Sequence, residues 1–537
     1  MRVSESAAFL ERNRTGLLIG VLVFAAAIRL LRANEDALWL DETASVWFSA
    51  QSWAYLWYEL PIHETNPPFY YMMLKIWTGL FGSSEFALRI PSVIASVAVV
   101  YFMWISGRLL GGSSRGWALG LAAALICSAW QFQIGHAANA RGYAFSSLGV
   151  AMLMTGCLRL FAYSREVGKA PQLFGPEGLA WLPFVEIAVG SVLALWSHLL
   201  AVVTVALVSV VLFLWWAVRH RCDWKLFLSL LASAALIVAL YCPYLLTFIA
   251  LATGEHKELS GIAFLEKPTF RWLVGLSSQA FGQQSFALGD LQVPVDALLI
   301  SIGFLGFWRV ARASTSEGNW MVGLVVTMIV GLWVILVLVT YLLQPVLMSR
   351  SLIFAQPPLI LMLACAPWAI TRGRAILATA FLGFIVIGTL QPLSVILPGQ
   401  RTFGTIVDLI SESDAPGAPV VIVPYLVETG LLYYEEKKGV TLNRHPYPSE
   451  FQLPNQPIPR IDPETASKIV SSLDGAPTVW VLTRRLDEVD PDTNLYRGLE
   501  NAGYRRSLVV HGEVIDWQET LSRFDREAGD QSQDELN

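Results

Sequence analysis

The strongest constraint in this sequence is a series of apolar stretches, each long enough to cross a lipid bilayer, that recurs from residue 16 to residue 397. A segment in hydrocarbon must satisfy its backbone N–H and C=O groups internally, so each stretch is expected to form a helix of roughly 20 residues. Apolar residues make up 55% of the chain and charged residues only 15%, which is unlike a soluble protein. We therefore predict a polytopic α-helical membrane protein.

About eleven stretches satisfy the length rule for a spanning helix. An odd number of crossings would put the two ends of this region on opposite sides of the membrane. The predicted spans cover residues 16–32, 90–107, 117–134, 142–161, 178–196, 199–218, 226–246, 291–310, 320–343, 352–370 and 375–397.

Arginine and lysine residues gather in every second connection between these stretches. Connections rich in these residues lie in the cytoplasm by the positive-inside rule. The N-terminus is therefore predicted to be cytoplasmic, and everything after residue 397 is predicted to be external. The basic residues in question are Arg12 and Arg14; Arg108 and Arg115; Arg165 and Lys169; Arg219, Arg221 and Lys225; Arg309 and Arg312; and Arg372 and Arg374.

The C-terminal part of the chain has a different pattern. Short β-like runs at residues 420–423, 478–482 and 507–510 alternate with helical stretches and with Pro, Gly and Asn breaks. This pattern predicts a small soluble α/β domain outside the membrane. The predicted domains are thus a transmembrane domain over residues 1–398 and an α/β domain over residues 399–537.

Charge and cysteine usage exclude two further classes. The net charge is -5, and the sequence contains no Lys/Arg block and no zinc-ligand cluster, so a nucleic-acid partner is not expected. The five cysteines include no C-x-x-C pair, and four of them fall inside apolar stretches. We interpret them as packing residues rather than as a disulfide framework.

Two acidic residues, Asp41 and Glu42, follow the first apolar stretch at the start of a long external loop, residues 33–89. A carboxylate at this point can act as a general base toward a substrate at the membrane surface. Alternatively, both residues are solvated loop acids, or acids at a helix N-terminus that offset its macrodipole. Neighbouring residues on a helix point about 100° apart, so at most one of the two serves as the base.

The same loop continues with His63, Glu64 and Asn66, directly before a double proline. These side chains can supply a metal ligand or contacts to a substrate. The alternative is an ordinary polar turn that caps the helix beginning at the prolines. The apolar segment after them, residues 67–81, is too short to span and is expected to lie along the membrane surface.

More polar residues gather at the predicted outer ends of the spans. Arg141, with Asn139 and Tyr143 beside it, opens the fourth span; His198 lies in the turn between the fifth and sixth; Arg350 precedes the tenth. A guanidinium group suits a lipid phosphate because its planar fork binds two phosphate oxygens. The alternatives are arginines that only anchor the helices at the headgroups and a histidine with a structural role.

The order and spacing of these residues resemble the GT-C superfamily of membrane glycosyltransferases. The resemblance is to the family 39 group, which contains protein O-mannosyltransferases and bacterial lipid A aminoarabinose transferases, and it spans most of residues 15–400. It rests on Asp41-Glu42 after the first span, the segments 66–71 and 85–92, Ala140-Arg141 with Tyr143, and Arg350.

This resemblance implies a GT-C fold, a polyprenyl-phosphate-linked sugar as donor, and inverting transfer on the outer face of the membrane. Asp41 matches the catalytic base of the family. A phosphate leaving group departs without a general acid, so one carboxylate that takes the acceptor proton suffices, while cations neutralise the departing phosphate. We expect Arg350 and Arg141 to do this, with Arg89 and Lys75 behind them. The other expected substrate contacts are Glu42, His63, Glu64, Asn66, Asn139, Tyr143 and His198.

The chain departs from the family pattern at Asn139, where relatives often carry an acid. A second acidic contact or metal ligand is then missing. Some relatives bind a divalent metal near the first loop and others work without one. The sequence therefore predicts no cofactor with certainty and leaves a divalent metal ion open.

Two other functions remain open at this stage. A transporter or flippase for a lipid-linked glycan also needs many spans and interfacial arginines, but it favours polar residues and interrupted helices at mid-membrane. The other is an inactive scaffold whose external domain binds a partner. The polar groups gather at the outer ends, so we favour an enzyme of the bacterial inner membrane. Its acceptor, whether a lipid, a glycan or a protein, is not readable from the sequence, and neither is the sugar.

Overall fold

The computed structural model describes residues 13–34, 37–64, 66–173, 180–221, 223–253, 267–269, 272–273, 275, 292–313, 317–343, 345–370, 383, 402–449, 459–511 and 519–526. These residues form two compact units. The first consists of the described residues within 1–34, 64–254 and 262–396, and the second of those within 35–63 and 397–537. Each unit is considered by itself.

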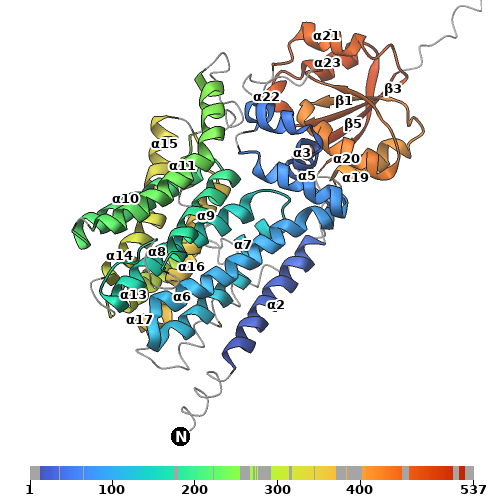
Figure 1. Ribbon diagram of the computed structural model, residues 1–537. Coiled ribbons are helices and arrows are strands. Elements are labelled where there is room, and N and C mark those ends of the chain that lie inside the picture. The colour runs from blue at the N-terminus through green and yellow to red at the C-terminus, as the bar shows by residue number, and fades with distance from the viewer. Residues whose placement is uncertain are drawn as a thin grey trace, which may run out of the picture. The chain divides into compact units, whose positions relative to one another are not determined.

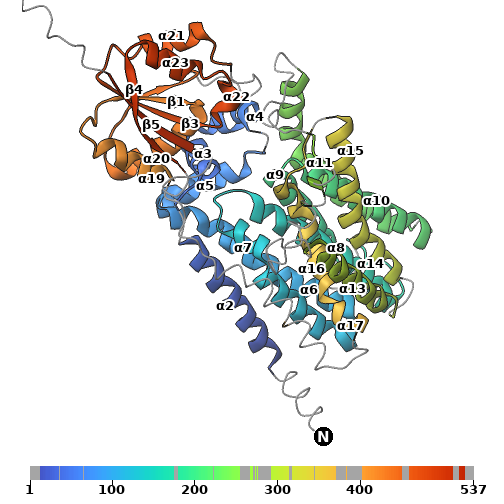
Figure 2. The ribbon, with the colours of Figure 1, turned by 180° about the vertical axis from the view of Figure 1, so that it is seen from behind.

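The first unit is entirely helical (Figures 1 and 2). Within the described residues, eight helices are long and apolar enough to cross a membrane, or nine if a bent pair is counted as one span. The helices are α2 (Arg14–Ala33), α5 (Phe69–Phe81), α6 (Glu85–Ala129), α7 (Gln131–Ala137), α8 (Tyr143–Val167), α9 (Leu182–Ser197), α10 (Ala201–Arg219), α11 (Trp224–Thr253), α13 (Gln292–Arg312), α14 (Glu317–Val326), η4 (Thr327–Gly331), α15 (Leu332–Leu342), η5 (Ser349–Ala355), α16 (Gln356–Ala364) and α17 (Ala366–Ile370).

The predicted spans coincide with helical segments, except that the last of them, residues 375–397, lies outside the described residues. Two of these predicted spans differ from a single straight helix that is long enough to cross the membrane. The third span is a bent pair, because the helix breaks at Trp130 and α7 continues at 58° to the preceding arm of α6. The fifth, α9, has only 16 residues and is shorter than a standard span.

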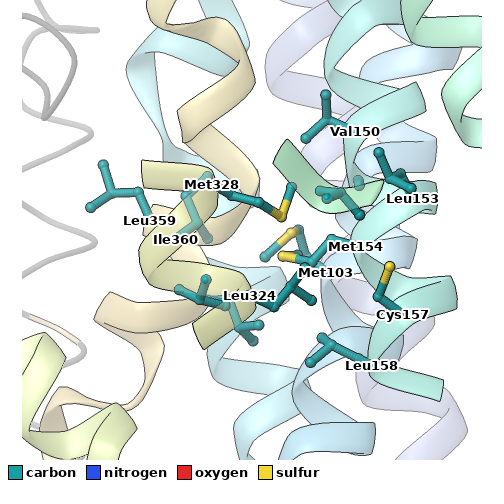
Figure 3. Packing of buried hydrophobic residues seen from close by; sticks show 14 of the residues in the cluster. Met103, Val150, Leu153, Met154, Cys157, Leu158, Leu324, Met328, Leu359 and Ile360 are labelled. Carbon is teal, nitrogen blue, oxygen red and sulfur yellow. The ribbon is translucent and has the colours of Figure 1, made fainter. Parts of the chain in front are cut away.

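Figure 3 shows part of the core of this unit, where side chains from α6, α8, α14, η4 and α16 pack together. Met103 comes from α6, Met154 from α8 and Leu324 from α14, and all three are buried. Leu359 and Ile360 of α16 belong to the same cluster. Unbranched methionines fill gaps between helices that meet at different angles.

Helices α8 and α9 pack backbone against backbone. A Cβ atom at Gly149 would lie 2.5 Å from the Ala194 nitrogen, and one at Gly190 would lie 2.5 Å from the Leu153 nitrogen. No side chain fits at that distance, so only glycine permits it. Small residues at facing positions allow such close approach between membrane helices.

A buried arginine stabilises the break in the helix at Trp130. The guanidinium of Arg29 on α2 donates to the carbonyls of Cys127 (3.1 Å) and Ser128 (2.9 Å) and to Ser96 Oγ (2.7 Å). The carbonyls at the end of a helix have no partner within the helix, and a cation is favourable there. Arg29 thereby joins α2 to the first part of α6, which carries Ser96, and to the end of α6, which carries Cys127 and Ser128.

The second unit contains a five-stranded sheet in the order β2-β1-β3-β5-β4. Strand β1 is parallel to β2 and β3, whereas β5 is antiparallel to β3 and β4. The strands are β1 (Pro419–Val423), β2 (Asn443–Pro446), β3 (Thr478–Arg484), β4 (Tyr504–Val510) and β5 (Glu519–Arg526). The helical elements are α3 (Leu40–Ala50), η1 (Tyr55–Glu59), α4 (Leu60–His63), α19 (Thr402–Ser411), η7 (Tyr425–Val427), α20 (Glu428–Lys438), α21 (Pro463–Ser471), α22 (Leu486–Val489) and α23 (Asn494–Asn501).

Helices cover both faces of this sheet (Figures 1 and 2). Val421 of β1 and Val479 of β3 share a buried cluster with Ala466 of α21 and Leu499 of α23. Helices α19 and α20 lie on the opposite side (Figure 1). The prediction of an α/β domain is confirmed, and its three predicted strands are β1, β3 and β4.

The second unit also contains a segment from the first loop. Residues 37–63, with helix α3, group with the C-terminal residues rather than with the helical unit. The predicted domain limits assign this loop to residues 1–398, so the described grouping joins parts of the chain that lie far apart in the sequence.

We expect Gly149→Ala to destabilise the membrane unit, because the added methyl group overlaps backbone atoms of α9. Overpacking of this kind costs about 1–3 kcal/mol, which thermal unfolding in detergent would register as a lower midpoint. Gly20→Ala is the matched control, since a Cβ there meets nothing within 4 Å. Equal midpoints for the two variants would show that α8 and α9 do not approach so closely.

Candidate active site

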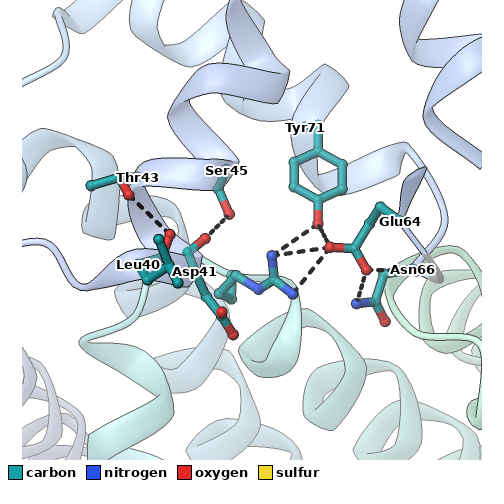
Figure 4. Close-up of polar contacts among 8 residues, drawn as sticks. Leu40, Asp41, Thr43, Ser45, Glu64, Asn66 and Tyr71 are labelled. Carbon is teal, nitrogen blue, oxygen red and sulfur yellow. Dashed lines mark hydrogen bonds and ion pairs between the residues drawn. The ribbon is translucent and has the colours of Figure 1, made fainter. Parts of the chain in front are cut away.

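An ion pair between Glu64 and Arg141 is the centre of the polar cluster in the membrane unit. The Arg141 guanidinium lies 3.3 Å from Glu64 Oε2, and both side chains are almost fully buried. Tyr71 bridges the pair, because its hydroxyl donates to Glu64 Oε2 (2.9 Å) and accepts from Arg141 Nη1 (3.1 Å). Figure 4 shows Tyr71 and Asn66 on either side of Glu64, each joined to its carboxylate by a dashed line.

Local sequence fixes each member of this cluster. Asn66 donates to Glu64 Oε1 through both its backbone N–H (3.0 Å) and its side-chain amide (2.9 Å), which closes the turn before the prolines. Tyr71 lies in the first turn of α5. Arg141 lies in the tight turn before α8, and its carbonyl accepts from Ser92 Oγ (3.3 Å).

Glu64 is ionised in this setting. Burial alone would raise the pKa of its carboxyl, but the charge of Arg141, the hydrogen bonds from Asn66 and Tyr71, and the charge of Arg350 together lower it. Burial is also the main reason that the pKa of Tyr71 is raised well above its usual value. The phenol therefore keeps its proton and donates it to Glu64.

Aromatic and imidazole rings extend the cluster. Arg141 stands over the Tyr143 ring at 5.9 Å, and that ring lies 4.8 Å from His136 and 6.0 Å from His198. Burial and the charge of Arg350 lower the pKa of His198 to about 3. His198 is therefore neutral at pH 7. Its Nδ1 accepts the backbone N–H of Leu200 (3.2 Å), so the ring carries its proton on Nε2.

Arg350 belongs to the same electrostatic neighbourhood. It lies in η5, directly before α16, and its charge acts on Glu64 and on His198. Phe354, one turn further along, contacts the His198 ring at 5.3 Å between centroids. The structure thus brings together Glu64, Asn66, Arg141, Tyr143, His198 and Arg350 from the predicted set.

Three predicted substrate contacts have structural partners instead. Arg89 is buried and donates to the carbonyl of Ala33 (3.1 Å), the last residue of α2. The Asn139 amide donates to the Gly135 carbonyl (3.3 Å). Glu42 is buried and accepts the backbone N–H of Trp39 (3.3 Å), as an acid in the first turn of a helix does. Their contact with a substrate stays a prediction.

Asp41 is the second residue of α3, in the second unit. Its backbone carbonyl accepts from Ser45 Oγ (2.9 Å), while Thr43 Oγ1 donates to the Leu40 carbonyl (2.9 Å), as Figure 4 shows. The Asp41 side chain is half-buried, and the positive end of the helix macrodipole favours its negative charge. The side chain of His63, at the end of α4, lies outside the described part of the structure.

Sequence reasoning missed Tyr71 and His136. Tyr71 follows Phe69 and Tyr70, and composition alone cannot say which of three successive aromatic residues faces inward. Helix periodicity gives no signal either, because Glu64 lies outside helix α5, which begins at Phe69. His136 lies five residues before Arg141, directly after the predicted third span, residues 117–134.

The described residues do not form a metal site. No group of three or more His, Cys, Asp or Glu side chains among them is arranged to hold a metal ion. The oxygens of Glu64 accept from Asn66, Tyr71 and Arg141, and a guanidinium 3.3 Å away disfavours a second cation. Glu64 is therefore better suited to hold Arg141 than to bind a metal.

We expect Glu64→Ala to destabilise the protein by about 3–5 kcal/mol, because it leaves the buried Arg141 charge uncompensated. The double variant Glu64→Ala/Arg141→Leu should lose less than the sum of the two single variants. Thermal unfolding in detergent measures each value, with Glu166→Ala as the control, since Glu166 is an exposed acid that pairs with Arg165. Additive losses would mean that the pair has no coupling energy.

The ion pair also predicts a pH dependence. The folded-state pKa of Glu64 is lowered, so its contribution to stability is complete above the unfolded value of about 4.5 and is lost as the pH falls through the folded value. The difference in thermal midpoint between wild type and Glu64→Gln should therefore stay constant near neutral pH and shrink below about pH 4.5. A constant difference throughout the acidic range would contradict this assignment.

No family model and no curated protein sequence matches the chain. Solved structures, in contrast, are similar to the chain. ArnT from Cupriavidus metallidurans in the apo state has a TM-score of 0.58 at 14% identity, covering 95% of this chain and 98% of that chain. ArnT bound to undecaprenyl phosphate has a TM-score of 0.56 at 13% identity with the same coverage.

A second group of similar structures is archaeal. The oligosaccharyltransferase AglB from Archaeoglobus fulgidus, in complex with an inhibitory peptide and a dolichol-phosphate, has a TM-score of 0.51 at 12% identity, covering 93% of this chain and 73% of that chain. Identities this low establish the fold alone. They confirm the predicted fold class: the chain is a polytopic helical membrane protein with a C-terminal α/β domain, and it shares the fold of these solved structures.

Proposed function

We propose that this protein is a glycosyltransferase that moves a sugar from a polyprenyl-phosphate donor to an acceptor at the outer face of the membrane, with Asp41 as general base. One observation carries the proposal: within a GT-C fold, Arg141, in the turn before α8, pairs with the carboxylate of Glu64 at 3.3 Å, and the charge of Arg350, in η5, acts on the same carboxylate. Structures with this fold have been solved with undecaprenyl phosphate and with a dolichol-phosphate bound.

The proposed reaction is a single displacement. A hydroxyl or amine of the acceptor attacks the anomeric carbon of the donor sugar, and the bond from that carbon to the phosphate oxygen breaks. The electron pair leaves with the polyprenyl phosphate, and Asp41 takes the proton of the attacking group. Attack from the face opposite the leaving group inverts the anomeric configuration.

The two arginines stabilise the leaving group in this proposal. Charge on the phosphate grows as the bond breaks, and a preorganised guanidinium in a water-poor site stabilises it more strongly than in water. Glu64 and Tyr71 hold Arg141 in one orientation, so little reorganisation is needed. Neutral His198 adds no charge, and its Nε2–H is available to donate to a substrate oxygen.

The remaining assignments follow from the charge pattern and the resemblance. We assign the protein to the bacterial inner membrane as a multi-pass protein, with its N-terminus in the cytoplasm and its C-terminal domain external. We also keep the division into a transmembrane domain, residues 1–398, and an α/β domain, residues 399–537. The acceptor class is left as a lipid, a glycan or a protein.

A flippase for a lipid-linked glycan is the competing function. It would favour interrupted helices and polar groups inside the membrane, and the bend at Trp130 and buried Arg29 are features of that type. The Arg29 donors, however, are taken up by Ser96 and by backbone carbonyls of Cys127 and Ser128. This gives Arg29 a structural role and favours the enzyme.

Replacing the base tests the enzyme directly. We expect Asp41→Asn to lower the rate of sugar transfer by about 100-fold or more, with donor binding unchanged. The measurement is transfer of radiolabelled sugar from a panel of polyprenyl-phosphate donors in proteoliposomes. Asp492→Asn, at an exposed turn of the C-terminal domain, is the control. Donor binding by wild type without transfer to any acceptor fraction would favour the flippase instead.

The donor phosphate contact is tested separately. We expect Arg350→Ala to weaken donor binding and to lower kcat/KM by about 100-fold, as loss of one preorganised donor does. Arg350→Lys should recover only part of the lost donor binding and kcat/KM, because an ammonium group lacks the planar fork of a guanidinium. Lys225→Ala, which removes a positive charge from an exposed position in the first turn of α11, serves as the control. Unchanged donor affinity in Arg350→Ala would remove Arg350 from the phosphate site.

A further inference from the structure

We infer that the C-terminal α/β domain positions the proposed base, through a direct clamp of helix α20 on helix α3. The residues that do this are Tyr434 and Thr429. The inference rests on the proposed function, because it concerns how Asp41 is held for catalysis. It assigns a role to a domain whose sequence indicates none.

Two hydrogen bonds form the clamp, and they bracket Asp41. The backbone N–H of Leu38, three residues before Asp41, donates to the Tyr434 hydroxyl at 3.0 Å. The hydroxyl of Thr43, two residues after Asp41, lies 3.3 Å from the hydroxyl of Thr429. Because the Thr43 proton goes to the Leu40 carbonyl, Thr43 accepts here, and Thr429 shares its proton between Thr43 and the Leu426 carbonyl. Both partners lie on α20, almost 400 residues further along the chain.

The clamp is shielded from water, whereas Asp41, between its two bonds, is only half-buried. Leu38 and Thr43 are each 1% exposed, Tyr434 is 4% exposed and Thr429 is 8% exposed. A buried hydrogen bond is costly to break, because the groups left behind find no water. The contacts therefore fix α3 on α20 while part of Asp41 stays at the surface of the unit.

Helix α20 is itself held firmly within the domain. A Cβ at Gly430 would overlap the Phe403 ring of α19, so the two helices meet at a position that only glycine allows. At its other end, Glu435 accepts from the Leu442 N–H (3.2 Å) and from Arg444 (2.9 Å), which begins the connection to β2. The sheet, α20 and α3 thus form one continuous packed structure.

Contacts inside α3 cannot replace this clamp. The bonds from Ser45 to the Asp41 carbonyl and from Trp39 to Glu42 fix the first turns of the helix, but they do not set where the helix lies. A general base must reach its proton within hydrogen-bond distance, and a displacement of about 1 Å can cost about 100-fold in rate. Tyr434 and Thr429 are accordingly positioning residues for Asp41.

Removing the clamp hydroxyls tests this role. We expect Tyr434→Phe and Thr429→Val each to lower kcat of sugar transfer by about tenfold, with the donor KM unchanged. Thr429→Ser keeps the hydroxyl and should restore kcat, which a loss of general stability would not do. Tyr433→Phe, the neighbouring tyrosine on the same helix, is the matched control. Wild-type kcat in both Tyr434→Phe and Thr429→Val would overturn the inference.

A reversible cross-link provides a second measurement, which compares the oxidised and reduced states of one and the same variant. The variant Thr43→Cys/Thr429→Cys replaces the two hydroxyls that lie 3.3 Å apart. When oxidised to a disulfide it should transfer sugar at close to the wild-type rate, and when reduced it should be slower by about tenfold. Each single cysteine variant, treated in the same way, controls for the native thiols.

The outcomes separate this inference from the proposed function. Loss of transfer on oxidation, with donor binding retained, would show that α3 must leave α20 during catalysis and would overturn the clamp. Absence of transfer in wild type from every donor would instead overturn the proposed function. Transfer by wild type with equal rates in the oxidised and reduced double variant would remove only the clamp.

Discussion

The membrane unit depends on how the helix formed by α6 and α7 pairs the backbone hydrogen-bonding groups at its break, Trp130. In a medium without water, a break leaves carbonyl and N–H groups that the protein must pair. At Trp130 the Arg29 guanidinium takes the carbonyls of Cys127 and Ser128, and the indole N–H of Trp130 donates to Gln356 Oε1 (2.6 Å). These bonds tie the break to α2 and to α16, and they make a bend of 58° stable.

The bend has a direct consequence for the polar cluster. A straight helix would continue through the span, whereas the bent segment ends at Ala137 and leaves a short turn that presents Arg141. Gln133 within this segment donates to Ser147 of α8 (2.8 Å) and accepts from Ser96 of α6 (3.3 Å). Hydrogen bonds thus run from α2 through α6 and α7 to α8.

Hydropathy predicted the spans because they are long apolar runs, and short runs of β-branched and other apolar residues predicted β1, β3 and β4. Strand β2, Asn-Arg-His-Pro, lies at the edge of the sheet, and in β5 only Leu521 and Phe524 are apolar, so neither gives a clear apolar signal. The sequence predicted Glu64 and Arg141 as substrate contacts but not as an ion pair with each other, and the capping role of Glu42 depends on a helix boundary. The packing of α3 on α20 joins distant segments, which local patterns cannot reveal.

The glycine contact between α8 and α9 sets the dimensions of the cluster. A Cβ at Gly142 would lie 2.8 Å from the Ser197 carbonyl, so the close approach continues to the point where α8 begins and α9 ends. Arg141 and His198 are the residues next to that contact. The backbone segments that carry these two residues are therefore held close together by the same glycine contact that joins the two helices.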